Sequence, residues 1–209
     1  MDQSILVKRV RVSDIVITAA IYAAASLSIL LLAGIVCYTF VKGISSISWQ
    51  FLTTVPSSLK GTFGIAGNLL NTLYIVVITL VIATPIGVGS AIYLNEYAKP
   101  GKVVRTIEFT TEILSGIPSI IFGLFGMVFF GNTLGLGYSI ITGALTLTLM
   151  VLPLITRNTQ EALKTVPESY RSGALGMGAA RWYMIRTILL PSAMPGIITG
   201  IILAVGRIV

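Results

Sequence analysis

The 209-residue sequence is 55% hydrophobic and only 10% charged, more apolar surface than a water-soluble domain could bury. Its net charge of +7 comes from basic residues scattered between apolar runs, which argues against nucleic acid as a partner. With no histidine and a single cysteine, Cys37, the sequence excludes an intramolecular disulfide, and we expect an all-α polytopic membrane protein without metal or cofactor.

The first apolar run extends from Ile15 to Val41 and carries no charge over 27 positions. About 20 apolar residues cross a bilayer, so the run predicts a transmembrane helix. It is too long for a signal peptide, and no cysteine follows Leu32-Ala33-Gly34 to make a lipoprotein signal. The stretch from Lys42 to Gly67 is predicted to be an external loop with Trp49 as an interfacial anchor.

Three further spans are predicted from the apolar runs that follow. The second covers Asn68 to Leu94 and contains Pro85, which should kink the helix, for mobility or simply for packing. The next uncharged run is long enough for two spans with a turn between Gly131 and Gly137. We therefore expect a third span from Ile113 to Phe130 and a fourth from Ile140 to Thr156.

A short helix is predicted after the fourth span, from about Pro167 to Met177. Proline and an acidic neighbour, Glu168, favour a helix N-terminus there. Each glycine in a helix interior costs about 1 kcal/mol relative to alanine, so this helix needs a partner surface. The alternative is a poorly ordered loop between two spans. The small residues that raise this question are Ser172, Gly173, Ala174, Gly176, Gly178 and Ala179.

The same segment resembles the EAA loop of ABC importer permeases, the cytoplasmic element that docks into the ATPase subunit. The resemblance lies in the spacing of Ser172-Gly173-Ala174, Gly178, Ile188 and Leu190-Pro191. Ser172 stands where Glu is common and Gly173 where Ala is common, so a salt bridge from that Glu is not expected. Flanking strings are similar to the PstA-type subunit of phosphate-specific importers; they are Leu114 to Gly123, Pro153 to Leu163, Val166-Pro167, Arg181-Trp182 and Pro195-Gly196-Ile197.

This resemblance implies a type I ABC importer transmembrane domain, with five of an expected six spans in this chain. Residues 1–66 would form the N-terminal segment, first span and external loop, and residues 67–209 the importer domain with its coupling loop at 157–191. The implied function is ATP-driven import of inorganic phosphate. The implied partners are a cytoplasmic ABC ATPase dimer, a related second permease subunit, an extracytoplasmic phosphate-binding protein and membrane lipid. The chain itself has no Gly-x4-Gly-Lys-Ser/Thr loop, so we expect no enzyme activity in it.

The fifth apolar segment is predicted to begin near Pro195. Its residues to Val209 reach about 22 Å, short of the roughly 30 Å hydrocarbon core, so we expect a missing C-terminal part. With a cytoplasmic N-terminus, eleven Lys and Arg lie inside and only Lys42 and Lys60 outside. The positive-inside rule favours this orientation, with the EAA-like loop on the ATP side. The resemblance implies that the membrane is a bacterial or archaeal inner membrane.

Two arginines are candidates for the substrate pathway. Arg207 is the only unambiguous charge in an apolar span, and such charges face a bundle interior or cavity, or snorkel to the interface. A guanidinium also suits phosphate oxygens. The phosphate permeases are similar in having an arginine here and a second at Arg157, which implies that both lie on the pathway. Ser172, Gly173, Ala174 and Gly178 are the residues that the resemblance assigns to ATPase coupling.

Three other functions stay open. The EAA-like loop does not select cargo, so sulfate or molybdate is possible in place of phosphate. A secondary transporter would carry acidic coupling sites, but the spans hold none beyond the boundary residues Asp14 and Glu112. A membrane-embedded enzyme lacks histidine and an intramembrane acid pair.

Overall fold

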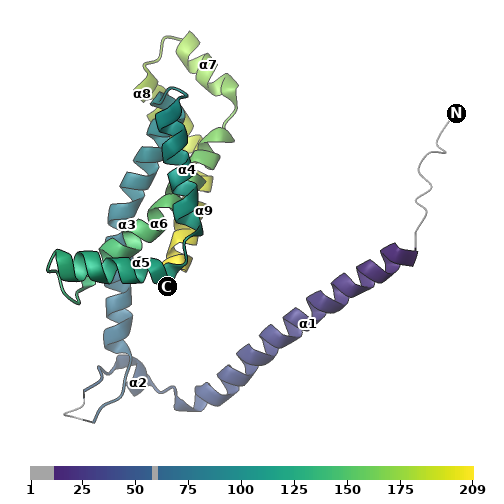
Figure 1. The fold of residues 1–209 in the computed structure, drawn as a ribbon, viewed down its shortest axis with the longest axis vertical. Coiled ribbons are helices and arrows are strands. Elements are labelled where there is room, and N and C mark those ends of the chain that lie inside the picture. The colour runs from purple at the N-terminus through teal and green to yellow at the C-terminus, as the bar shows by residue number, and fades with distance from the viewer. Residues whose placement is uncertain (1–11, 58–60) are drawn as a thin grey trace. The chain divides into compact units, whose positions relative to one another are not determined.

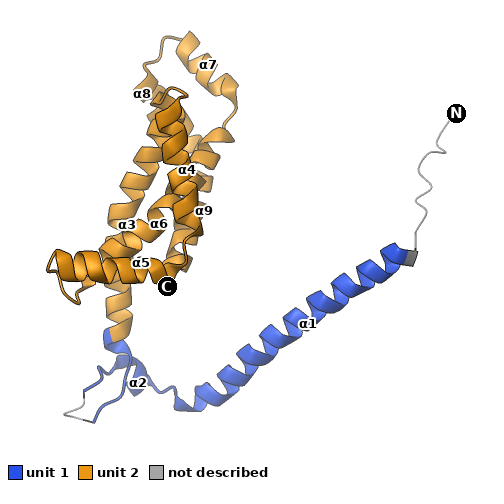
Figure 2. Cartoon of the chain, in the orientation of Figure 1, with its two compact units in different colours: residues 1–67 blue, residues 68–209 orange. Residues whose placement is uncertain are grey.

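The structure is a computed structural model that describes residues 12–57 and 61–209. It consists of two compact units, Met1–Gly67 and Asn68–Val209 (Figure 2). Within the described residues the regular elements are helices (Figure 1), and the β pairing is one isolated bridge between Ser57 and Thr62. The all-α expectation is therefore confirmed for this part of the chain.

The first unit contains the long helix α1 (Val12–Gly43), the 3-10 turn η1 (Ile44–Ser46) and the short helix α2 (Trp49–Thr53). Helix α1 contains the predicted first span, and within this unit it is exposed along its described length except at Gly43, which is half-buried. Helix α2 begins at the cap Ser48, whose hydroxyl accepts a hydrogen bond from the Phe51 amide at 3.1 Å.

The second unit is a bundle of helices joined by short connections. Three of its elements are π-helical, with wider turns than an α-helix. In chain order the elements are α3 (Ala66–Ile92), η2 (Tyr93–Tyr97), α4 (Lys102–Gly116), α5 (Ser119–Gly126), η3 (Met127–Thr133), α6 (Ile140–Lys164), α7 (Glu168–Gly176), α8 (Arg181–Met184), η4 (Ile185–Leu189) and α9 (Leu190–Ile208).

Helices α6 and α9 form the centre of this bundle and pack antiparallel. A Cβ on Gly196 would lie 2.6 Å from the Ala162 Cβ, and one on Gly200 would lie 2.7 Å from the Asn158 Cβ. Residue numbers thus rise along α9 as they fall along α6. Glycine at these points lets the two backbones approach more closely than any side chain would allow.

Helices α3 and α5 also pack against α6 through glycines at the points of close approach. A Cβ on Gly87 would lie 2.8 Å from Ile155 Cγ2, and one on Gly126 would collide with Thr146. Glycine in these two helices therefore brings them close to α6. The residues buried in this region are Ala83, Phe122, Met150, Val151, Ile155 and Ala204.

The predicted third span is wrong as a single helix. The chain breaks after Gly116, and the segments Lys102–Gly116 and Ser119–Thr133 are bent by 100° relative to each other. At the break Ile117 is extended, with φ −70° and ψ 131°, and Pro118 caps the next helix. The residue before a proline is driven out of the helical region, which accounts for the break. The predicted turn between residues 131 and 137 is present, with positive φ at Gly135 and Gly137.

In the part of the chain that the structure describes, four helical segments are long and apolar enough to cross a membrane, and the bent pair would make a fifth. The last segment runs from Arg181 to Ile208, 28 residues, and not from Pro195 as predicted. At 1.5 Å per residue it is about 42 Å long. The expectation that this span is too short to cross the hydrocarbon core was therefore wrong. The fourth span likewise continues past Thr156 to Lys164.

Candidate coupling site

Helix α7 lies at one end of the second unit, beyond the ends of α3 and α6 (Figure 1). It covers nine residues, Glu168–Gly176, with Pro167 as its N-cap and an acidic residue in its first turn. Proline pre-sets the backbone angle and the carboxylate complements the helix dipole. The prediction of a short helix is confirmed, and the alternative of a disordered loop is excluded.

The C-terminus of α7 is a Schellman motif built on Gly178. Its φ is +81°, a left-handed conformation that suits glycine. The Gly178 amide donates to the Leu175 carbonyl at 3.0 Å, and the Ala179 amide donates to the Ala174 carbonyl at 3.0 Å. These two bonds satisfy carbonyls that the helix end leaves free, so Gly178 sets where α7 stops.

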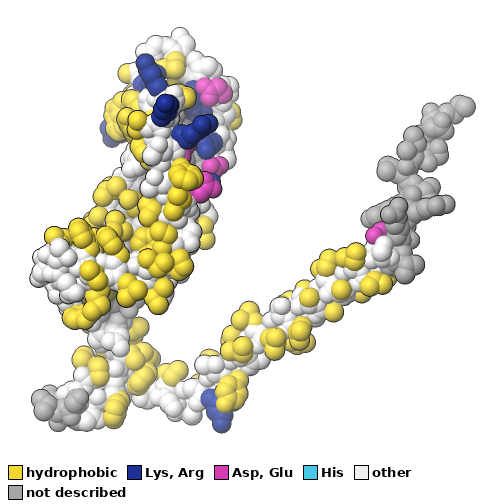
Figure 3. Space-filling model, viewed as in Figure 1, with side chains coloured by type: hydrophobic (Ala, Val, Ile, Leu, Met, Phe, Trp, Pro, Cys, Tyr) yellow, Lys and Arg dark blue, Asp and Glu magenta, His cyan; other side chains and the backbone are white. Residues whose placement is uncertain are grey.

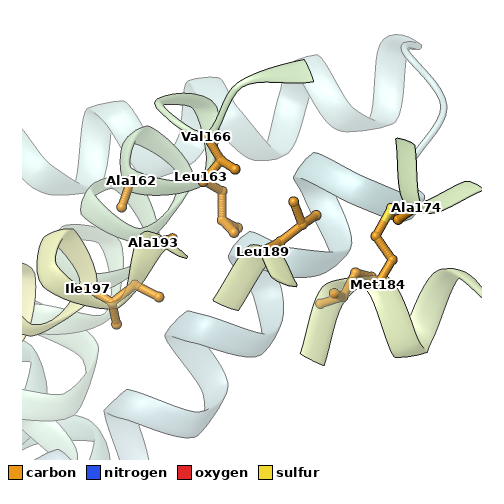
Figure 4. Close-up of a cluster of buried hydrophobic side chains, with 9 residues drawn as sticks. Ala162, Leu163, Val166, Ala174, Met184, Leu189, Ala193 and Ile197 are labelled. Carbon is orange, nitrogen blue, oxygen red and sulfur yellow. The ribbon is translucent and has the colours of Figure 1, made fainter. Parts of the chain in front are cut away.

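Ala174 is the one buried residue of α7, only 2% exposed. It belongs to the apolar cluster between α7, the end of α6 and the segment from α8 to α9 (Figure 4). In the close-up Ala174 lies beside Met184, with Leu189 further along the same cluster. The side chain of Ala174 therefore contacts its own chain and orients α7.

The other predicted coupling residues lie on the outer side of the helix. Ser172, Gly173 and Gly178 are exposed, and a Cβ on Gly173 would meet no atom within 4 Å. The Ser172 hydroxyl donates to the Glu168 carbonyl of its own helix at 3.1 Å. Large apolar side chains are exposed around them; these are Tyr170, Leu175, Met177, Trp182 and Tyr183.

A buried ion pair that the sequence did not predict joins α7 to the end of α3. Arg171 Nη2 lies 2.9 Å from Glu96 Oε1, and the two side chains are only 13% and 6% exposed. Arg171 Nε lies 3.3 and 3.4 Å from the two oxygens of the same carboxylate. The hydrogen bond that Arg171 donates to Glu96 raises the pKa of Arg171 above its ordinary value. Desolvation by burial opposes this rise, and the negative charge of Glu96 adds to it.

Arg171 also caps the end of α6. Its Nη2 donates to the Leu163 carbonyl and its Nη1 to the Val166 carbonyl, each at 3.0 Å. Its Nη1 lies 3.3 Å from Glu168 Oε2 on the same helix. One guanidinium, with its five donors in a planar fork, thus contacts α3, α6 and α7 together.

Arg181, at the start of α8, contacts the same end of α3. Its Nη1 lies 3.4 Å from the Glu96 carbonyl oxygen, and its guanidinium carbon lies 5.8 Å from the centroid of the Tyr97 ring. A polar cavity of about 450 Å³ lies between these elements. It is lined by Asn95, Glu96, Lys164, Glu168, Arg171, Leu175, Arg181 and Met184.

The two arginines predicted for the substrate pathway lie at different levels of the bundle. Arg157, beside Asn158, is opposite Gly200, whereas Arg207 is seven residues further along α9, about 10 Å along its axis. Arg157 Nη1 lies 3.7 Å from Glu112 Oε1, with side chains 49% and 64% exposed. Among the ion pairs of the described residues, none includes Arg207.

Charge and apolar surface are separated along the second unit. In Figure 3 the basic and acidic side chains gather at the end that carries α7, and hydrophobic side chains cover the middle of the bundle. Charges avoid the hydrocarbon core, so the α7 end is the one expected in water. The bundle below it has the surface of a membrane-spanning body.

Comparison with known proteins identifies the family. Residues 83–209 match the family described as "Binding-protein-dependent transport system inner membrane component". The chain is 40% identical over 198 residues to the "Probable ABC transporter permease protein YqgI" of Bacillus subtilis, covering 95% of this chain and 67% of that protein. The chain belongs to this family.

Other relatives of this inner membrane component carry transport names. This chain is 37% identical to the "Phosphate transport system permease protein PstA" of Xylella fastidiosa, and the match covers 80% of this chain and 58% of that protein. A solved structure titled as inward-facing conformations of the MetNI methionine ABC transporter is 25% identical, with a TM-score of 0.57, covering 69% of this chain and 68% of that one.

The family membership fixes the class of protein. The chain is an all-helical ABC permease subunit, a non-catalytic, multi-pass inner membrane component. The matched region contains the whole α7 segment, Arg157 and Arg207, and leaves α1 and the loop after it outside. Membership of a binding-protein-dependent transport family implies that an ATPase and a binding protein are partners.

Proposed function

We propose that this chain is the permease subunit of an ATP-driven importer of inorganic phosphate, and that α7 is its coupling helix. The observation that carries the proposal is the geometry of α7. It is an ordered helix with its small residues Ser172 and Gly173 exposed and with Ala174 holding it to the bundle. Such a helix fits a groove of a cytoplasmic ATPase, the helix-in-groove mode of recognition.

The role of each predicted coupling residue follows from this geometry. An exposed glycine at position 173 allows close approach of the partner, since a Cβ there meets open space. Gly178 ends the helix and Ala174 orients it. Closure of an ATPase dimer on nucleotide would displace α7, and the packed helices behind it would carry the movement into the bundle.

The assembly that we propose contains this chain, a related second permease subunit, two ATPase subunits and an extracytoplasmic phosphate-binding protein in membrane lipid. In this proposal the N-terminus and α7 of this chain face the cytoplasm, because that orientation places eleven of its basic residues inside and two outside. Support for the second permease is the 31% identity, over 96% of this chain, to the "Phosphate transport system permease protein PstC" of Mesorhizobium japonicum.

Phosphate as the substrate is supported by relatives that are named for it. We place Arg207 and Arg157 on the pathway of the anion, where a guanidinium offers paired donors to phosphate oxygens. Arg157 forms an ion pair with Glu112, whereas Arg207 makes no ion pair among the described residues. Arg207 is therefore the better candidate for contact with the anion. Sulfate or molybdate is the second candidate substrate, since a tetrahedral oxyanion offers the same contacts.

The proposal is tested in vesicles that contain the permease pair and ATPase, with the binding protein outside. Labelled phosphate should accumulate only with internal ATP, and a hundredfold excess of unlabelled phosphate, but not of sulfate or molybdate, should abolish uptake. The Arg207→Gln variant should lose at least tenfold in uptake at equal abundance, whereas Lys42→Gln should not. Accumulation of labelled sulfate or molybdate, but not of labelled phosphate, would transfer the assignment to the other oxyanion. Uptake driven by an ion gradient alone would reject the ATP-driven class.

A further inference from the structure

The orientation of α7 depends on few contacts. Ala174 is the one buried residue of the helix, and its side chain is a single methyl group. The connections on either side, residues 165–167 and 177–180, are short but carry no helix of their own. Ala174 therefore contributes one small apolar contact to the orientation of α7, and a second, polar contact adds to it.

Arg171 supplies that contact. Its guanidinium reaches the Glu96 carboxylate at 2.9 Å and the Leu163 and Val166 carbonyls at 3.0 Å each. A slide or rotation of α7 relative to α3 or α6 would break several of these bonds together. Because both side chains are largely covered by the protein, each charge would then lose its partner where few others are within reach.

Glu96 lies in a π turn at the end of α3. The helix widens into the π turn Tyr93–Tyr97, and the Ala98 amide donates to the Tyr93 carbonyl at 2.9 Å. Within that turn the Asn95 amide nitrogen donates to Glu96 Oε1 at 2.7 Å. The carboxylate thus has a hydrogen bond within its own turn in addition to those from Arg171.

We propose that the Glu96–Arg171 ion pair makes α7 and the ends of α3 and α6 move as one body, so that a displacement of α7 reaches span α3 instead of being lost in the connecting loops. Both residues are positioning residues that act through α7. The inference rests on the proposed function for the source of the displacement, while the fixed attachment itself is a property of this chain alone.

The attachment is tested first without any partner. Cys37 is the only cysteine of the chain, so a Cys37→Ser background allows spin labels at two exposed positions, Tyr93→Cys in η2 at the end of α3 and Ser169→Cys on α7. The distance distribution should be narrow in this background and at least twice as broad with Glu96→Gln or Arg171→Gln. The double variant should be no broader than Arg171→Gln, because the pair is already lost.

A matched control is the exposed ion pair of Lys164 and Glu161, 3.1 Å apart with side chains 54% and 63% exposed. Glu161→Gln should leave the distribution unchanged, since exposed pairs contribute little. Arg171→Lys keeps the charge but loses the fork and should be intermediate. Helical content by circular dichroism shows whether each variant is folded. Distributions as narrow as the background in both folded single variants would overturn the proposal.

The second measurement uses the assembled transporter. Glu96→Gln should retain ATP hydrolysis within about twofold of wild type and lose at least tenfold in uptake per ATP, as expected when an ATPase turns over without moving the spans. Unchanged uptake per ATP would contradict the proposed rigid coupling. If the wild-type assembly moves no phosphate, the proposed function fails, and the label distances still decide whether the ion pair fixes α7.

Discussion

Single glycines at α7 have opposite roles, although the sequence shows them only as a dense run of small residues. Gly178 is in the left-handed region at φ +81°, whereas Gly173 is helical with open space around its missing side chain. Gly178 has a backbone angle that suits glycine, and Gly173, in the proposed coupling role, leaves room for a partner to approach. Substituting each by alanine separates these two roles.

Gly178→Ala should destabilise the end of α7 by about 1–2 kcal/mol, the cost of a Cβ in the left-handed conformation. Gly173→Ala should stabilise the isolated permease helix by about 0.5–1 kcal/mol, because alanine has the higher helix propensity. Hydrogen exchange of the backbone amides at position 178 and at Ala179 reports the change, and it should accelerate only in the first variant. Equal protection in both variants would show that the Schellman bonds do not hold the helix end.

The residues of the site were predictable to different degrees. The helix near Pro167 and the turn glycine could be found because their signals are local. The Glu96–Arg171 pair could not, because its members are 75 positions apart and each looks like an ordinary charge beside a span. The inward direction of Ala174 also escaped prediction, since no local pattern distinguishes it from the exposed Gly173.

At the scale of the element, close backbone contact decides how the helices pack. Gly196 and Gly200 of α9 lie against Ala162 and Asn158 of α6, too close for any added side chain without movement. Gly206 is on the same helix, and nothing lies within 4 Å of the position of its Cβ. The three glycines look alike in sequence and differ only in their neighbours.

Gly200→Val should therefore destabilise the unit by about 1–3 kcal/mol, the usual cost of overpacking, whereas Gly206→Val should change it by less than about 0.5 kcal/mol. Thermal unfolding of the purified chain in detergent, followed by circular dichroism, provides the comparison. The packing described for α6 and α9 would be wrong if the two variants melted at the same temperature.

Elements were predicted well where length and lack of charge decide, and poorly where tertiary contacts decide. The apolar runs located α1, α3 and α6, because a bilayer demands long uncharged helices. The helices continue past those runs, since helical hydrogen bonds do not end at the edge of the membrane. Pro118 indicated an irregular third span, but the 100° bend depends on packing of α5 against α6 that a one-dimensional pattern does not contain.

At the scale of the whole molecule, the orientation in the membrane is the prediction with the widest consequence. Tyr138 precedes α6 and Met177 follows α7, so they lie beyond opposite ends of α6, and they are 90% and 84% exposed. In a Cys37→Ser background, Met177→Cys should be blocked only by a thiol reagent that enters the cytoplasm, and Tyr138→Cys by an impermeant one. The reverse pattern would invert the proposed topology and remove α7 from the ATP side.

The place of α1 outside the family match has a consequence for the evolution of this protein. Helix α1 lies outside the family match, which begins only at residue 83. A membrane span outside the matched region must above all be long and apolar enough to cross the bilayer, a requirement that many sequences meet. Its sequence can therefore drift, or be replaced by another apolar stretch, while the bundle that carries α7 stays as it is.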